Sequence, residues 1–180
     1  MNRRTLIHRT AGATLAFGLG AGVMPQAFAS QAPGARRLSF INTHTGDTFA
    51  DAYWENGNYV SDALAAINHV MRDHRSNETH AIDVRLLDQL TQLRGVVGAS
   101  APFQIISGYR SPATNAALHE NSSGVATHSL HMEGRAIDIR VRGVELPNLR
   151  DAALGMQAGG VGYYPSSDFI HVDTGRVRRW

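Results

Sequence analysis

Two short segments with alternating side chains place the strongest constraint on how this chain of 180 residues can fold. Residues 137–141 read IDIRV and residues 170–173 read IHVD, so branched apolar residues alternate with polar ones. Successive side chains of a strand point to opposite faces of a sheet. Each segment therefore predicts a strand with one face in the core and the other toward a cleft or solvent. The predicted core residues are Ile137, Ile139, Val141, Ile170 and Val172.

The polar faces of these two strands carry residues that bind metals. Asp138 lies on the first strand and His171 on the second, while His131 comes seven residues before Asp138. Gly134 lies between His131 and Asp138 and lets the backbone turn there. If the two strands are neighbours, two histidines and one carboxylate leave the fourth position of a tetrahedral zinc open for water, as in catalytic sites. The same ligands also serve other divalent metals, including iron, and a chance grouping among nine histidines is the alternative.

Other patterns along the chain predict an α+β domain. Residues 37–54 predict a hairpin around a Thr-Gly-Asp turn, and residues 103–109 predict a short apolar strand. Apolar spacing and start signals predict helices at residues 61–74, 81–98, 111–120 and 146–157. Helices that come early and mostly antiparallel strands that come late are typical of the α+β class.

Residues 1–29 predict an export signal. A basic start, an apolar run over residues 11–24 and the small residues AFA before Ser30 are the layout of a secretory signal. The Arg3-Arg4 pair resembles a twin-arginine signal. The apolar run is short for a bilayer span, and an uncleaved anchor is the alternative. We expect cleavage near Ala29, a single domain over residues 30–180, and a location in the periplasm.

The composition limits the partners and the metal ligands. Without residues 1–29 the chain has 14 arginines and 15 acidic residues, a net charge of −1, and this argues against a nucleic-acid partner. No transmembrane partner is evident either. The chain has no cysteine, so histidines and carboxylates must hold any metal.

Several motifs resemble one family of zinc peptidases. SLHMEGRAID, residues 129–138, matches the pattern S-x-H-x-x-G-x-A-x-D of the D-Ala-D-Ala carboxypeptidase type. The chain more closely resembles the MepK-like murein endopeptidases from about residue 43 to residue 180, through SGYRSPATNAAL, HSLHMEGRAIDIR, GGVGYYP and FIHVDTGRVRRW. The resemblance implies one zinc ion held by His131, Asp138 and His171. It also implies a hedgehog/D-Ala-D-Ala peptidase-like α+β fold, with a small antiparallel sheet that carries the metal site and is flanked by N-terminal helices.

The resemblance also implies catalytic roles. Arg110 corresponds to an arginine that helps hold the substrate or the developing oxyanion, and a structural salt bridge is the alternative. Many carboxypeptidases of this class carry an acidic residue three positions before the last histidine ligand, which here is Asp168. Asp168 is therefore the expected general base, with Asp173 and His128 as alternatives. A further alternative for Asp173, which shares a strand face with His171, is to orient a metal ligand.

Four further residues border the expected site. Ser129 and His128 either bind the substrate or fix the loop by hydrogen bonding. Tyr163 or Tyr164 contacts the substrate or, alternatively, packs under the final strands. We expect the two tryptophans, Trp54 and Trp180, to be packing residues.

These expectations together predict a periplasmic zinc endopeptidase that hydrolyses peptidoglycan cross-links, in particular those that involve meso-diaminopimelate. A D-Ala-D-Ala carboxypeptidase is one alternative, and a closed cleft beyond the scissile bond would distinguish it. A non-catalytic zinc-containing peptidoglycan-binding domain is the other, and a metal site without a nearby general base would favour it.

Overall fold

The computed structural model describes residues 34–121 and 125–180, so the expected export signal lies outside the described residues. The strands are β1 (Ala35–Asn42), β2 (Thr48–Glu55), β3 (Asn58–Tyr59), β4 (Phe103–Ser107), β5 (Ala136–Val141), β6 (Gly160–Tyr164), β7 (Phe169–Asp173) and β8 (Arg178–Arg179). The α-helices are α1 (Ser61–Val70), α2 (Val84–Val97), α3 (Pro112–Glu120) and α4 (Leu146–Met156). Two short 3-10 helices are η1 (Leu130–Glu133) and η2 (Pro165–Ser167). None of the described helices is both long and apolar enough to cross a membrane.

The described strands form one mixed sheet in the order β3-β2-β1-β4-β5-β7-β6-β8. The α+β class is confirmed, but the expectation of a small antiparallel sheet is wrong. The sheet has eight strands, and the pairs β1–β4 and β6–β8 are parallel. Helices α1 and α2 lie between β2 and β4 in the chain. Parallel neighbours need such a long crossover, because a tight turn can only join antiparallel strands.

The predicted hairpin is confirmed as the antiparallel pair β1–β2, and the predicted helices form with shorter bounds. Helix α1 ends at Val70 rather than at residue 74. The Val70 carbonyl accepts a hydrogen bond from Nδ2 of Asn42 at 2.9 Å. A carbonyl at a helix end needs a partner from outside the helix, and strand β1 supplies it.

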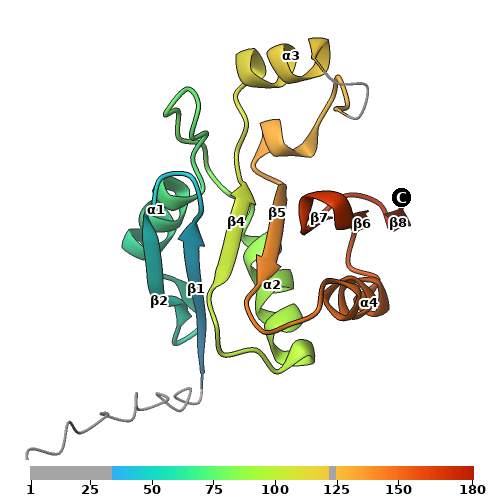
Figure 1. Cartoon of the computed structure of the whole chain (residues 1–180). Coiled ribbons are helices and arrows are strands. Elements are labelled where there is room, and N and C mark those ends of the chain that lie inside the picture. The colour runs from blue at the N-terminus through green and yellow to red at the C-terminus, as the bar shows by residue number, and fades with distance from the viewer. Residues whose placement is uncertain (1–33, 122–124) are drawn as a thin grey trace, which may run out of the picture. The chain divides into compact units, whose positions relative to one another are not determined.

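Helices α1, α2 and α4 pack against the sheet and enclose the core, while η1 and α3 lie beyond the ends of β4 and β5 (Figure 1). The five predicted core residues of β5 and β7 are all buried in this core, as expected. The polar residues between them point to the opposite face of the sheet. That face carries the candidate site.

Asp73, in the loop after α1, holds the segment that connects β4 to α3. Its Oδ2 accepts a hydrogen bond from the amide of Ser111, and its Oδ1 accepts one from the amide of Arg75, both at 2.9 Å. Burial alone would raise the pKa of Asp73, but hydrogen bonds from Thr114 and from the two backbone amides outweigh burial and hold this pKa well below its usual range. Asp73 thereby fixes the backbone beside Arg110.

Replacing Asp73 by asparagine is expected to lower the free energy of unfolding at neutral pH by about 1–3 kcal/mol, because the new amide group turns a donor toward a buried N–H. A carboxyl with a lowered folded pKa adds stability above its unfolded pKa of 3.8, and this contribution is lost as the pH falls through the folded pKa. The difference between wild type and Asp73→Asn should therefore shrink in acid. Urea unfolding of both proteins at pH 7 and pH 3 measures this difference in the free energy of unfolding. The exposed Asp51→Asn is the control and should match wild type at both values; a difference for Asp73→Asn that does not change with pH would contradict the assignment.

Candidate metal centre

The register between β5 and β7 brings two potential ligands together. Asp138 lies directly opposite His171 in this antiparallel pair, between the core pairs Ile137–Val172 and Ile139–Ile170. The expected meeting of Asp138 and His171 is confirmed. It follows from strand parity, because a register that buries the apolar residues of both strands on one face also places their polar residues together on the other.

The third residue, His131, comes from η1 just before β5. Ser129 precedes η1, and its Oγ accepts a hydrogen bond from the amide of His131 at 3.4 Å. Gly134 ends η1 with a φ of 65°, which is left-handed backbone that favours glycine. A Cβ at Gly134 would also collide with the carbonyl oxygen of Ala81. The turn expected at Gly134 is therefore confirmed.

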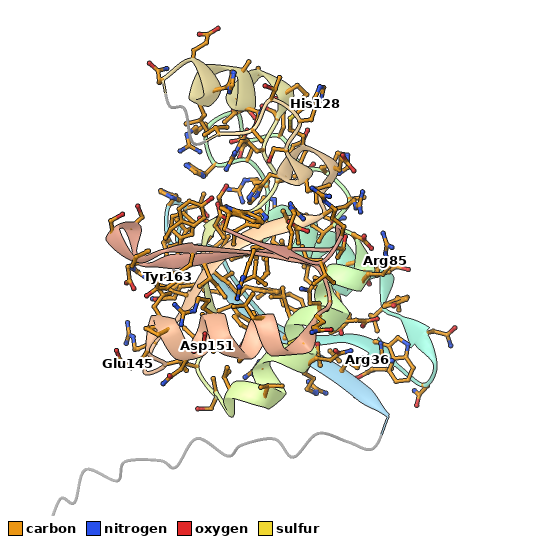
Figure 2. The ribbon with its side chains drawn as sticks, turned by 90° about the vertical axis from the view of Figure 1, so that its right-hand side faces the viewer. Arg36, Arg85, His128, Glu145, Asp151 and Tyr163 are labelled. Atoms are coloured by element: carbon orange, nitrogen blue, oxygen red, sulfur yellow. The ribbon has the colours of Figure 1, made fainter. Side chains whose placement is uncertain are left out.

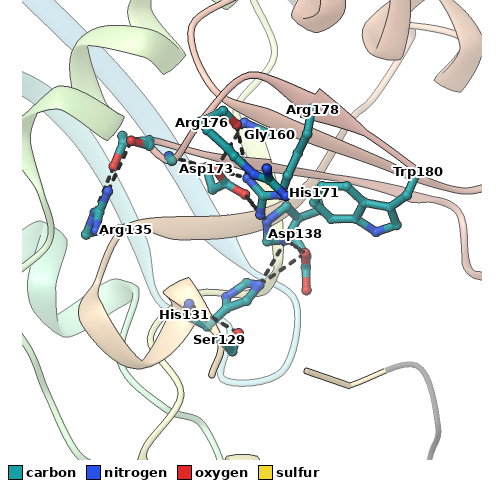
Figure 3. A network of polar contacts seen from close by, with 12 residues as sticks. Ser129, His131, Arg135, Asp138, Gly160, His171, Asp173, Arg176, Arg178 and Trp180 are labelled. Carbon is teal, nitrogen blue, oxygen red and sulfur yellow. Dashed lines mark hydrogen bonds and ion pairs between the residues drawn. The ribbon is translucent and has the colours of Figure 1, made fainter. Parts of the chain in front are cut away.

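Three side-chain atoms converge at this point (Figure 3). Oδ1 of Asp138 lies 2.9 Å from Nδ1 of His171 and 3.3 Å from Nε2 of His131, and the two nitrogens are 3.1 Å apart. All three side chains are buried. Ligands at about 2.0 Å from a tetrahedral ion lie roughly 3.3 Å from one another. The observed separations resemble those of ligands around one small ion.

Hydrogen bonds on the far sides of the rings show which nitrogens face the centre with a lone pair. Nδ1 of His131 lies 2.7 Å from the carbonyl oxygen of Gly108, which can only accept, so this nitrogen carries the proton. Nε2 of His171 lies 2.9 Å from Oδ2 of Asp173 and donates to that carboxylate. Partners of this kind orient the histidines of metal sites. In the neutral rings, the inner nitrogens are therefore acceptors.

The lone pairs of His131 and His171 and one carboxylate oxygen of Asp138 thus point at one another in the protein interior. Three acceptors repel one another unless a cation lies between them or one ring takes a second proton. The group formed by His131, Asp138 and His171 can therefore hold a metal ion. These residues supply nitrogen and oxygen ligands of the kinds that zinc and iron accept.

The pKa shifts show how strongly these groups interact. Burial would raise the pKa of Asp138, but the charges and hydrogen bonds of His131 and His171 outweigh burial and hold it well below its usual range. Burial would lower the pKa of His171, but its bonds to Asp138 and Asp173 outweigh burial and raise it. The centre therefore binds a positive charge strongly, and protons compete with a metal for it.

Arg110 lies beside this centre, as expected from the sequence. Its Nη2 is 3.8 Å from Oδ2 of Asp138, and its hydrogen bonds to Asn115 and Ser107 are long, at 3.4 Å each. Its Nε is buried and has no partner among the described residues. Burial lowers the pKa of Arg110, and the carboxylate of Asp138 opposes this shift. An incompletely paired guanidinium beside the centre is suited to bind an anionic group.

The centre lies in a pocket of about 430 Å³. His128, Ser129 and Arg110 line this pocket. The pocket is large enough for part of a peptide.

The structure does not bring Asp168 or Tyr163 to this pocket. Asp168 follows η2, and its Oδ2 accepts a hydrogen bond from Nη1 of Arg140 at 2.8 Å in a separate pocket. Tyr163 lies on the side of α4, with the guanidinium of Arg150 4.5 Å from its ring centre (Figure 2). Its neighbour Tyr164 lines the metal pocket instead.

Sequence reasoning missed the place of Trp180, which we expected to be a packing residue. Trp180 is 49% exposed, and it lines the pocket. Strand parity could have shown which of the two tyrosines, Tyr163 or Tyr164, lies near the centre. Gly162 pairs with His171, and Tyr164, two residues later, lies on the same face of the sheet as Gly162. No comparable pattern in the sequence pointed to Trp180.

Asp173, which we considered as a general base, contacts the outer nitrogen of His171 and is not one of the three residues of the centre. It is buried, and it accepts hydrogen bonds from His171, from both terminal nitrogens of Arg178 and from the amides of Gly160 and Gly175 (Figure 3). A carboxylate with this many donors is suited to orient His171.

Comparison with known proteins gives a consistent result. A family model described as peptidoglycan L,D-endopeptidase MepK matches residues 30–180. The peptidoglycan L,D-endopeptidase MepK of Escherichia coli (strain K12) is 46% identical over 164 residues, which cover 90% of each chain. The probable peptidoglycan L,D-endopeptidase MepK of Haemophilus influenzae is 38% identical over 165 residues, covering 90% of this chain and 89% of that protein.

Proposed function

Because the chain belongs to the MepK family of peptidoglycan L,D-endopeptidases, we propose that it hydrolyses peptide cross-links of peptidoglycan, in particular those that involve meso-diaminopimelate. The observation that carries this proposal is the convergence of three buried acceptor atoms on the wall of a pocket. Three acceptors this close together need a positive charge between them, and a divalent cation would supply it. The α+β domain with this group on η1, β5 and β7 also supports assignment to the hedgehog/D-Ala-D-Ala peptidase-like fold.

We propose one zinc ion as the cofactor, held by Nε2 of His131, Oδ1 of Asp138 and Nδ1 of His171. When bound, zinc supplies a Lewis acid that polarises the scissile carbonyl and activates a water molecule. Three protein ligands, rather than four, support a catalytic site over a closed structural one. Gly108 and Asp173 accept the hydrogen bonds of the outer nitrogens, so each neutral ring directs the lone pair of its inner nitrogen at the centre.

Arg110 is proposed to stabilise the negative charge that develops on the carbonyl oxygen during attack. Its buried position strengthens this interaction, because a low dielectric increases the attraction between opposite charges. Its weak hydrogen bonds to Asn115 and Ser107 leave donors available for the substrate.

For proton transfer the geometry favours His128 over Asp168. A general base must reach the attacking water directly or through one water molecule. His128 lines the pocket, whereas Asp168 pairs with Arg140 outside it. The carboxylate of Asp173 already accepts hydrogen bonds from five donors. We therefore propose His128 as the residue that takes the proton from water and passes it to the leaving amine. Ser129 then serves to fix the loop that carries His128 and His131.

The family supports action at the cell wall, and we propose a periplasmic location with export directed by a signal in residues 1–29. The peptidase domain would then comprise residues 30–180. Peptidoglycan is the proposed partner.

Digestion of purified, cross-linked peptidoglycan tests the function. The protein with added zinc should convert dimeric muropeptides to monomers identified by mass, and a chelator or His131→Ala should abolish this conversion. His69→Ala, an exposed histidine on α1, is the matched control and should be active. Release of D-Ala from intact dimers would instead indicate the carboxypeptidase. An undigested wall that retains the zinc-loaded protein would indicate the binding domain.

A further inference from the structure

Trp180 lies beside the candidate metal centre. Its indole ring centre is 5.2 Å from that of His171, and both side chains line the same pocket (Figure 3). Its backbone pairs with β6, where the Trp180 amide donates to the carbonyl of Val161 and the Trp180 carbonyl accepts from the amide of Tyr163. The side chain is nevertheless half exposed. Part of the Trp180 surface therefore forms a wall of the pocket.

Three neighbours hold the indole in place. Its Nε1 donates a hydrogen bond of 2.7 Å to the hydroxyl of Tyr164, and the guanidinium of Arg178 lies 4.8 Å from its ring centre. The ring covers Gly162, where a Cβ would come within 2.7 Å of the indole. Gly162 therefore provides the space that the indole occupies. A ring held in this way loses little conformational entropy when it binds a ligand.

Two further aromatic rings extend this surface. Tyr164 stacks on Phe169 with ring centres 4.7 Å apart, and both line the metal pocket. Trp180, Tyr164 and Phe169 form what we call the aromatic wall. Arg178, which stacks on Trp180, is bound to Asp173, and Asp173 in turn binds His171. One network of side chains therefore fixes both the aromatic wall and a metal ligand.

We propose that the aromatic wall is a substrate-binding surface that contacts the aliphatic part of the stem-peptide residue next to the scissile bond. This inference rests on the proposed function. One peptide residue spans about 3.3–3.6 Å, so a group that touches Trp180 lies within one or two residues of the bond cleaved at the centre. The glycan strands are separated from a cross-link by the rest of the stem peptide. The methylene chain of a diamino acid offers apolar surface to the indole face.

The two tryptophans of the chain allow a direct test by fluorescence. Trp54→Phe leaves Trp180 as the only tryptophan, and adding an uncross-linked muropeptide to this zinc-loaded protein should change its emission saturably. The peptide-free disaccharide should cause no change. Trp180→Phe is the matched control, because Trp54 also has an arginine over its ring but lies at the opposite edge of the sheet. Its emission should not respond to either ligand.

Kinetics provide the second measurement. Trp180→Ala should lower kcat/KM on dimeric muropeptides at least about tenfold, chiefly through KM, with zinc content and melting temperature unchanged. Trp180→Phe should lose less, and Trp54→Phe should equal wild type. Wild-type kinetics in Trp180→Ala, or loss of zinc or of folding in that variant, would overturn the proposal. A response to the disaccharide alone would overturn it as well. If wild type cleaves no dimers but Trp180 still responds to the muropeptide, the proposed function fails and the binding surface stands.

Discussion

Replacing Asp138 by asparagine is expected to abolish zinc binding at micromolar concentrations and to lower kcat/KM on cross-linked muropeptides by about 10³-fold or more. The asparagine has nearly the same shape but no negative charge. Without that charge, the two inner nitrogens of His131 and His171 face a neutral oxygen, and the attraction for a divalent cation falls sharply. Metal content after dialysis and the rate of dimer cleavage measure the two effects.

Asp151→Asn is a suitable control, because Asp151 is an exposed aspartate on α4 whose ion pair is with its neighbour Arg150. Its zinc content and activity should equal those of wild type. If Asp138→Asn keeps a full equivalent of zinc and full activity, the assignment of this centre is contradicted. Far-ultraviolet circular dichroism should show that both variants are folded.

Replacing Arg110 by methionine is expected to lower kcat by about 10²–10³-fold, the usual effect of removing one group that stabilises an oxyanion. Methionine fills similar space but cannot donate. Arg110→Lys should restore only part of the activity, because an ammonium group is a point charge without the planar fork of a guanidinium. Both variants should keep their zinc. Steady-state kinetics measures the loss of kcat, and metal analysis shows that this loss does not come from loss of zinc.

Arg37, which is partly buried and pairs with Asp51 on the hairpin, provides the matched control for Arg110. Arg37→Met should retain wild-type kcat. A purely structural Arg110 would give a variant with a lower melting temperature and an unchanged kcat for the folded fraction, which would refute the proposed role.

Local sequence patterns predicted much of this domain. The hairpin β1–β2, the helices and the core faces of β5 and β7 each depend on neighbouring residues, since period and turn signals act over a few positions. The parallel pairing of β1 with β4 was not predictable in this way. It depends on how α1 and α2 return the chain across the sheet, and this path cannot be deduced from the sequence of either strand.

The candidate site also contains residues that the local sequence predicted and residues that it did not. Asp138 and His171 were predictable, because strand parity places each on a polar face and the apolar residues fix the register between the strands. His131 was predictable with Gly134, which permits the turn between the ligands. Asp168 illustrates the limit of spacing arguments. Three residues before a ligand is a fixed distance in sequence, but the left-handed turn at Asp168 directs its carboxylate to Arg140.

The sequence by itself determined which side chains are available to a metal and on which face of each strand they lie, because both properties depend on residue type and on the alternation of a strand. Only the tertiary structure decided which groups surround them. Gly108 and Trp180 are separated from the ligands that they contact by loops, and these contacts arise when the loops pack. Contacts of this kind depend on the path of the whole chain, so no short pattern of residues specifies them.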